Sequence, residues 1–217
     1  MNVEKARFNM IEQQIKPWKV LDDKLLGAMA TLPREMFVPD GHKNLAYADI
    51  SVPLAHNQMM HTPREIARMI QALELDGSEK VLEIGCGSGY SSAVLAKLAK
   101  KVFSVDIIPE FIEQAQKVLT QLAIDNVNLE EADAAEGWLV HAPYDAILVT
   151  SALSELPDAL KRSLNPGGKI VAVIGSAGQY QCQVFHLDDE NSWHHHVLFP
   201  IVAKPMINAE EPNQFEF

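Results

Sequence analysis

The hydrophobic positions follow two different patterns along the chain, and the change falls near residue 75. In residues 1–75, apolar positions recur at helical spacing in segments that prolines separate. Residues 76–217 alternate short β-branched runs with amphipathic stretches, which is typical of a parallel sheet whose strands are joined by helices. We therefore expect an α/β fold with three parts. An open, doubly wound, mainly parallel sheet spans 76–204, an N-terminal helical cap over 1–75 belongs to the same compact unit, and 205–217 form a polar tail.

The first region predicts three helices. Residues 4–16 and 22–32 have helical spacing and end before prolines, whereas residues 40–61 predict a loop with short extended segments. The sequence Thr-Pro-Arg-Glu at 62–65 is a capping box, in which the threonine is the N-cap and the glutamate reaches back to its backbone N–H. A third helix should begin there.

The second region predicts strands that alternate with helices and a final antiparallel hairpin. The strands are expected over 80–84, 102–105, 127–130, 146–149 and 169–174. The helices are expected over 90–99, from Pro109 onward, and over 155–163. The hairpin should pair 183–187 with 193–202 around a turn at 188–191.

Composition narrows the functional classes. The 217 residues are 47% hydrophobic and 22% charged, as in an ordinary globular domain, and no apolar run is long enough to cross a bilayer. The formal net charge of −11 disfavours a nucleic-acid partner, because phosphate binding needs a basic surface. Cys86 and Cys182 form no metal-ligand pattern, and the N-terminus has no signal-peptide pattern. We expect no metal site and a reducing, cytoplasmic location.

The most informative motif is a glycine loop, Glu83-Ile84-Gly85-Cys86-Gly87-Ser88-Gly89, between a predicted strand and a predicted helix. Glycines there let the backbone turn tightly and approach a ligand closely. The dinucleotide pattern G-x-G-x-x-G is not met, because the third glycine comes one residue early. The carboxylate of Glu83 would oppose a pyrophosphate, but it suits a ligand that carries a sulfonium and an ammonium. The loop resembles the S-adenosylmethionine loop of class I methyltransferases.

Two aspartates follow the next two predicted strands. Asp106 ends its strand about 20 residues after the loop, where an acid commonly binds ribose hydroxyls. Asp133 follows the third strand, where it could accept a hydrogen bond from an adenine amino group or cap a helix, and the Ala134 backbone could serve the ring. Both aspartates should lie at the carboxyl edge of the sheet, where open α/β sheets bind ligands.

Motifs outside the loop carry a more specific resemblance. They are Met29–Pro39, Ala46–Asp49, Val52–Leu54, Ala142–Ala152 and Leu164–Val171. With them, the chain resembles the protein-L-isoaspartate O-methyltransferase family over about residues 4–204. The resemblance implies a class I methyltransferase that methylates isoaspartyl carboxylates of damaged proteins for repair. Its cofactor would be S-adenosylmethionine and its product S-adenosylhomocysteine. The cofactor-binding residues are predicted to be Gln58, Glu83, Gly85, Cys86, Gly87, Gly89, Asp106, Ile107, Asp133 and Ala134.

One motif departs from the family. The family usually carries G-Q-T-I-S-x-P before the capped helix, with the serine at the methyl-transfer site, whereas this chain has N-Q-M-M-H-T-P at 57–63. His61 replaces the serine and is the candidate catalytic residue. The candidate substrate-binding residues are Met59, Met60 and Thr62. The capping box predicts that the Thr62 hydroxyl is already committed to the helix.

The replacement leaves the acceptor open. A histidine N–H could orient a carboxylate, which needs no general base because it is ionised at neutral pH. The larger ring could instead fill the peptide pocket, or serve as a base for another acceptor. Two alternatives therefore stand beside the repair enzyme: a methyltransferase with a different acceptor, and a non-catalytic S-adenosylmethionine-binding module. The run His194–His196 predicts no metal site, because successive strand residues point to opposite faces.

Overall fold

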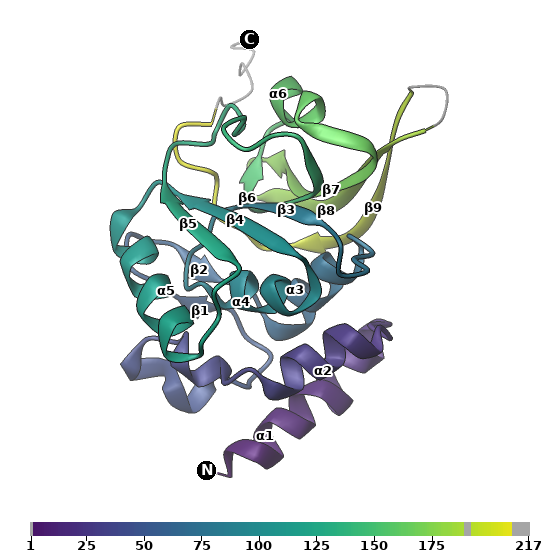
Figure 1. The fold of residues 1–217 in the computed structure, drawn as a ribbon. Coiled ribbons are helices and arrows are strands. Elements are labelled where there is room, and N and C mark those ends of the chain that lie inside the picture. The colour runs from purple at the N-terminus through teal and green to yellow at the C-terminus, as the bar shows by residue number, and fades with distance from the viewer. Residues whose placement is uncertain (1, 189–191, 210–217) are drawn as a thin grey trace.

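The computed structural model describes residues 2–188 and 192–209, and these form a seven-stranded sheet, a small two-stranded sheet and surrounding helices (Figure 1). The helices are α1 (Val3–Asn9), α2 (Asp23–Thr31), α3 (Pro63–Gln71), α4 (Tyr90–Leu98), α5 (Pro109–Gln121) and α6 (Asp158–Arg162). The strands are β1 (Val52–Pro53), β2 (Met59–Met60), β3 (Lys80–Ile84), β4 (Lys101–Asp106), β5 (Val127–Glu131), β6 (Tyr144–Leu153), β7 (Leu164–Ser176), β8 (Gln179–Leu187) and β9 (Trp193–Ile201).

The large sheet has the order β5-β4-β3-β6-β7-β8-β9. The first five of these strands are parallel, while β8 pairs antiparallel with β7 and β9 pairs antiparallel with β8. The predicted α/β class, the mainly parallel sheet and the C-terminal antiparallel hairpin are confirmed. The strand order reverses between β3 and β6, which is the place where open α/β sheets form a ligand crevice.

Apolar side chains cover both faces of the sheet. One core joins alternate residues of the central strands, such as Val81, Val102 and Leu148, to α2, α3 and α4. The other core joins the intervening residues to α6 and to the loop before β6, with Leu160 as its helical anchor. Because both faces are covered, β3 is almost continuously apolar, and Glu83 is its only buried charged residue.

Several elements differ in length from the sequence prediction. The first helix continues as a π-helical turn at Met10–Ile15 and a 3₁₀ turn at Lys16–Trp18, so Pro17 lies inside its last turn rather than beyond it. The strand predicted over 169–174 begins at Leu164, and β8 begins before residue 183, because β7 and β8 form a hairpin of their own around Ala177 and Gly178. The predicted turn at 188–191 lies mostly outside the described residues.

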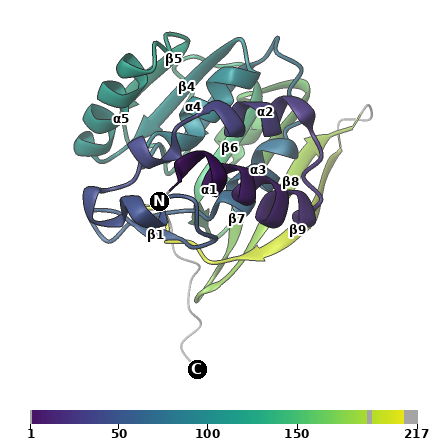
Figure 2. The ribbon, with the colours of Figure 1, turned by 90° about the horizontal axis from the view of Figure 1, so that it is seen from below.

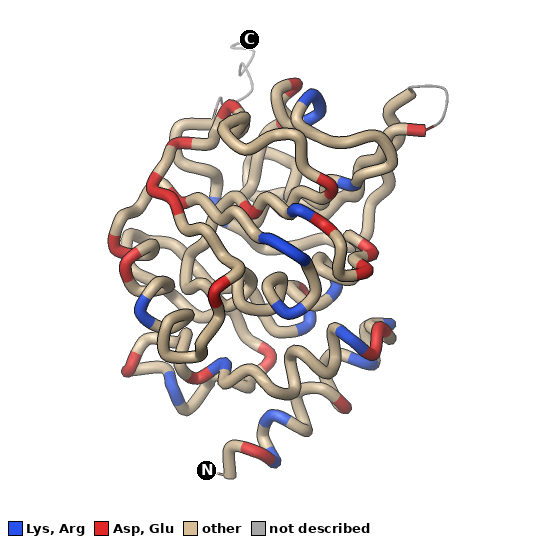
Figure 3. The backbone as a smooth tube through the Cα atoms, viewed as in Figure 1, with Lys and Arg blue, Asp and Glu red and all other residues tan. Residues whose placement is uncertain are grey.

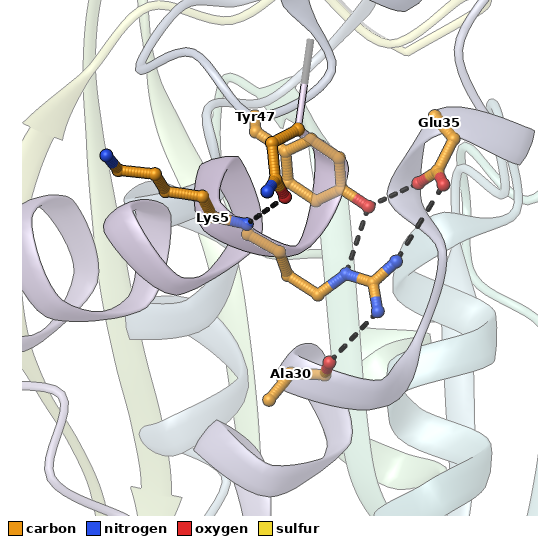
Figure 4. Close-up of polar contacts among 6 residues, drawn as sticks. Lys5, Ala30, Glu35 and Tyr47 are labelled. Carbon is orange, nitrogen blue, oxygen red and sulfur yellow. Dashed lines mark hydrogen bonds and ion pairs between the residues drawn. The ribbon is translucent and has the colours of Figure 1, made fainter.

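The N-terminal helices cover one face of the sheet, where α1, α2 and α3 lie together (Figure 2). A polar network joins α1 to α2 and to the segment after it (Figure 4). The Arg7 guanidinium donates to the Ala30 carbonyl of α2 at 3.2 Å and to Tyr47 Oη at 3.1 Å, and the Tyr47 hydroxyl donates to Glu35. Burial, together with the Glu35 hydrogen bond, raises the pKa of Tyr47 to about 12. Tyr47 therefore stays a neutral donor that ties α1 to the rest of the cap.

Charged residues are distributed over many elements, and lysines and arginines do not gather along one of them (Figure 3). Within the described ranges, no helix is long and apolar enough to cross a membrane.

Candidate active site

A cleft opens at the carboxyl edge of the sheet, where β3, β4 and β6 end. Its empty space is about 930 Å³, counted out to the solvent at its mouth. The predicted residues that line it are Gln58, Met59, Met60, His61, Gly85, Cys86, Gly87, Asp106, Ile107, Asp133 and Ala134. Residues far apart in the sequence thus meet at one edge, as the parallel order of the strands requires.

The glycine loop forms the floor of this cleft. A Cβ at Gly85 would lie 2.3 Å from Thr150 Oγ1, whose hydroxyl donates to the Gly85 carbonyl at 2.8 Å, so the close approach of β6 excludes any side chain there. Gly87 has a φ of +52°, and the nearest atom to a Cβ at that position is Leu54 Cδ1, at 3.5 Å. A side chain at Gly87 would therefore occupy the cleft itself.

Asp106 lies at the end of β4, directly beside the loop. Its carboxylate accepts from the Gly87 N–H at 2.8 Å and from the Ile108 N–H at 3.0 Å. Burial raises the pKa of Asp106, while these two hydrogen bonds oppose the rise. Each carboxylate oxygen keeps a second lone pair. The group is therefore fixed in place and can still accept from two neighbouring hydroxyls.

Asp133 and Ala134 lie at the far end of the cleft, after β5. Asp133 accepts from the Ala135 N–H at 3.0 Å and from the Asn208 side-chain amide at 2.8 Å. The first contact is a local turn and the second comes from the C-terminal segment, which the sequence places in a polar tail. Ile107 and Ala134 contribute apolar surface beside the two aspartates.

Glu83 does not line the cleft, although the sequence predicts it as a cofactor contact. Its side chain is fully buried beneath the loop, where it accepts from the Ser104 hydroxyl at 2.6 Å and from the Ser92 hydroxyl. Burial raises the pKa of Glu83 to about 6. Because side chains alternate along a strand, Glu83 shares the face of Val81, which packs under α4, where Ser92 lies.

Gly89 and Thr62 also lie outside the cleft lining. Gly89 is the N-cap of α4 and packs against Ala115 of α5. Thr62 caps α3: its hydroxyl accepts from the Glu65 N–H at 3.3 Å, and Glu65 accepts from the Thr62 N–H at 2.9 Å. This is the capping box that the sequence predicts. It engages the Thr62 hydroxyl at the start of α3 and so keeps it away from the methyl acceptor.

His61 lines the cleft from the segment between β2 and α3. Its Nε2 is 2.8 Å from the carbonyl oxygen of Thr150, which can only accept, so Nε2 carries the proton and donates. Its Nδ1 lies 4.0 Å from Glu65 Oε2. The ring is 8% exposed and therefore forms part of the wall, with one N–H already committed.

Arg34 supports this wall from behind. It is 1% exposed, and its guanidinium donates to the carbonyls of Ala46 at 2.9 Å and His61 at 2.8 Å while it stacks over Tyr90 at 4.5 Å. Burial lowers its pKa. The sequence analysis includes Arg34 only within the motif Met29–Pro39. In the structure, its hydrogen bond to the His61 carbonyl fixes the backbone of residue 61.

Several lining residues were missed by the sequence analysis. Thr150 and Ser151 lie in a β-bulge of β6, between the pairs Val149–Ala172 and Ala152–Val173, which turns them toward the cleft. Other lining residues that the sequence analysis did not single out include Leu54, Lys204, Met206 and Ile207. The bulge leaves no local signal in the sequence. Thr150 does follow the strand predicted over 146–149, and that position indicates a residue at the carboxyl edge of the sheet.

Cys86, His194 and His195 are engaged in local contacts away from any metal or catalytic cluster that the described residues show. Cys86 is buried beside Ser92, and burial raises the pKa of its thiol, so it stays protonated. His194 pairs with Asp188, and His195 stacks on Phe185. Among the residues described, no cluster of three histidine, cysteine or acidic side chains could hold a metal ion.

The lining fits a nucleoside that carries positive charge. Two carboxylates, Asp106 and Asp133, face the cleft, and Glu83 lies buried beneath the loop. A pyrophosphate at this loop would face these acids, whereas a sulfonium would be attracted by them. The open space in front of Gly87 provides close access to the backbone.

Comparison with known proteins also indicates a methyltransferase. Residues 5–209 match the family model described as protein-L-isoaspartate(D-aspartate) O-methyltransferase. A protein-L-isoaspartate O-methyltransferase of Picosynechococcus sp. is 42% identical over 180 residues, which cover 83% of this chain and 81% of the relative. Another such enzyme, from Pelobacter propionicus, is 37% identical over 210 residues, 96% of this chain and 93% of the relative.

Solved structures share the fold. One protein-L-isoaspartate O-methyltransferase has a TM-score of 0.79 and 24% identity, and the match covers 93% of this chain but 65% of that longer chain. A Plasmodium falciparum protein described as such a methyltransferase, in complex with S-adenosyl-L-homocysteine, has a TM-score of 0.76 and 20% identity over 95% and 98% of the two chains. From the family model and the curated relatives, we conclude that the chain belongs to the protein-L-isoaspartate(D-aspartate) O-methyltransferase family.

Proposed function

We propose that this chain is an S-adenosylmethionine-dependent O-methyltransferase that methylates the carboxylate of isoaspartyl residues in damaged proteins. The observation that carries the proposal is the joint placement of the Gly87 backbone, Asp106 and Asp133 along one cleft, within a chain of this family. The buried free thiols of Cys86 and Cys182 agree with a reducing, cytoplasmic location.

The residues of the cleft have distinct tasks in this proposal. Asp106 accepts from the ribose hydroxyls, Asp133 accepts from the adenine amino group, and Ile107 and Ala134 pack against the ring. When bound, S-adenosylmethionine supplies an electrophilic methyl group, whose bond to sulfur breaks as a new bond to the acceptor oxygen forms. Met59, Met60 and the His61 ring form the acceptor side of the wall and exclude water from the reacting atoms.

No general base is needed for this transfer. An isoaspartyl carboxylate titrates near pH 4 and is therefore ionised at neutral pH. The protein has to orient one carboxylate oxygen toward the methyl carbon and keep the approach short. The ester product can then close to a succinimide and reopen in part as normal aspartate, which is the repair that the family performs.

Two experiments test the proposal. Calorimetry should detect binding of S-adenosylmethionine and S-adenosylhomocysteine, and binding of NAD in their place would contradict the cofactor assignment. A radiolabelled methyl-transfer assay should then show transfer to an isoaspartyl peptide but not to its aspartyl twin. Cofactor binding without transfer to any carboxylate would favour a non-catalytic binding module, and transfer to another acceptor would favour a different enzyme.

A further inference from the structure

The segment Lys204–Asn208, which follows β9, crosses the mouth of the cleft. It pairs with the end of β6, where the Ala152 N–H donates to the Lys204 carbonyl at 2.8 Å and the Met206 N–H donates to the Ala152 carbonyl at 2.8 Å. Lys204 and Met206 line the cleft. These backbone bonds fix the segment at the carboxyl edge of the sheet, next to the β6 bulge.

Lys204 brings a positive charge to this position. Its Nζ donates to Asn57 Oδ1 at 3.1 Å, next to the lining residue Gln58. An ammonium has three donors, and the Asn57 amide oxygen carries no formal charge that would balance it. Within residues 2–188 and 192–209, no carboxylate lies within ion-pair distance of Lys204.

Two other nitrogen donors near the acceptor side of the cleft wall, those of Arg34 and His61, are already engaged. Arg34 is buried, and its guanidinium holds two backbone carbonyls. The Nε2–H of His61 is committed to the Thr150 carbonyl. Two cationic side chains line the cleft, those of Arg34 and Lys204, and of these Lys204 alone is partly exposed and has no acidic partner in the described part of the chain.

Asn57 connects Lys204 to the departure from the family motif. The family usually has glycine at this position, and Asn57 has a φ of +57°, a left-handed conformation that glycine adopts freely and asparagine tolerates. The replacement therefore keeps the backbone and adds the side-chain oxygen that holds Lys204. His61, four residues later, replaces the hydroxyl of the family serine.

We propose that Lys204 binds the carboxylate of the acceptor in this chain and supplies the orienting donor that the serine supplies elsewhere in the family. The inference rests on the proposed function. Lys204 Nζ would donate to one carboxylate oxygen, while the other oxygen forms the new bond to the methyl carbon and the carbon–sulfur bond breaks. The sulfonium leaves as a neutral thioether, and no proton or further reactant is required.

Steady-state kinetics with an isoaspartyl peptide test the assignment. Lys204→Met should raise the KM for the peptide by about tenfold or more, because a charge-assisted hydrogen bond is lost. The affinity for S-adenosylmethionine should stay unchanged. Lys204→Arg should retain most of the activity, since it keeps a cationic donor. Lys97→Met is the matched control, because Lys97 is an exposed residue in the last turn of α4, away from the loop end of that helix.

A second variant separates an orienting role from a structural one. If Lys204 stands in for the serine, His61→Ser should restore a large part of the lost kcat/KM in the Lys204→Met background. Equal KM in wild type and Lys204→Met would overturn the assignment, and so would a loss that Lys204→Arg shares in full. Those results leave the proposed function intact, whereas a wild-type protein that neither binds nor methylates isoaspartyl peptides removes both.

Discussion

The two ends of the cleft are built differently. The nucleoside end consists of the glycine loop and the residues that follow β4 and β5, so each group sits where a strand ends. The acceptor end is assembled from three distant segments: residues 57–61, the bulge at Thr150 and Ser151, and residues 204–207. The first end depends on local geometry, and the second depends on tertiary contacts.

Their charges differ as well. Asp106 and Asp133 face the nucleoside end, with Glu83 buried beneath the loop, whereas Lys204 brings a positive charge to the acceptor end. A positively charged methyl donor and a negatively charged acceptor would each meet the opposite charge. Opposite charges at the two ends can hold two partners in a fixed relative orientation, and variants at each end test this arrangement separately.

The largest effect is expected at the floor of the nucleoside end. Gly87→Val should weaken cofactor binding by about a hundredfold or more, because the side chain fills ligand space and the φ of +52° disfavours it. Gly167→Val is a matched control: Gly167 has a φ of +79° and open space around its Cβ position. Calorimetry and thermal unfolding distinguish lost binding from lost folding. Similar losses of binding in both variants would show that strain, rather than the cleft, is responsible.

Asp106→Ala tests the charge at the same end. Loss of a hydrogen-bonding carboxylate should cost about 1.5–3 kcal/mol of cofactor binding free energy. The Gly87 and Ile108 N–H groups also lose their acceptor, so the unfolding temperature must be followed together with affinity. The peptide KM at saturating cofactor should change little. Wild-type cofactor affinity in this variant would refute the ribose assignment.

Glu83 gives a pH-dependent test of the acid beneath the loop. Burial raises the pKa of Glu83 to about 6 from its usual value of about 4.5, so its contribution to stability is fully present below 4.5 and is lost as pH rises through 6. The free energy of unfolding of wild type, relative to Glu83→Gln, should therefore fall by about 2 kcal/mol between pH 4.5 and 7. Chemical denaturation at several pH values measures this difference. A difference that does not vary with pH would show that Glu83 titrates normally.

At the acceptor end, His61→Ala should lower turnover of an isoaspartyl peptide by about fivefold, because one buried hydrogen bond to Thr150 is lost and the wall loosens. Cofactor affinity should not change. His61→Ser should be less impaired, since serine is the residue of the family. A gain of activity in His61→Ser would mean that the ring blocks the pocket, and equal turnover in all three proteins would withdraw residue 61 from the mechanism.

Most of the sheet could be predicted from sequence, because buried parallel strands leave short β-branched runs and helices leave periodic ones. The capping box at Thr62 and the strand ends at Ile84 and Asp106 follow from such local signals. The extent of β7 and β8 could not be predicted, since Leu164–Gly168 contains proline and glycines, and the pairing of residues 179–182 depends on a partner strand.

Of the two ends of the site, only the nucleoside end could be predicted from sequence as well as the sheet could. Asp106 and Gly87 are tied to strand–loop–helix geometry, which the sequence specifies. Glu83 was predicted as a cofactor contact from its charge alone, whereas its side chain lies buried beside Ser92 and Ser104. Lys204 had no signal at all: polar residues near a chain end give no indication of docking until the contact with β6 is known.

The smallest effect is expected where the C-terminal segment touches the nucleoside end. The Asn208 amide donates to Asp133 Oδ2 at 2.8 Å in an exposed position, so Asn208→Ala should cost only about 0.5–1 kcal/mol of cofactor binding free energy. Asn208→Asp should weaken binding more, because a second carboxylate would face Asp133 and the like charges repel. Isothermal titration with S-adenosylhomocysteine gives the order wild type, Ala, Asp if the segment orients Asp133. Equal affinities of the three proteins for S-adenosylhomocysteine would mean that residues 204–208 contribute to the acceptor end alone. The two ends of the cleft would then be connected through the sheet and not through this segment.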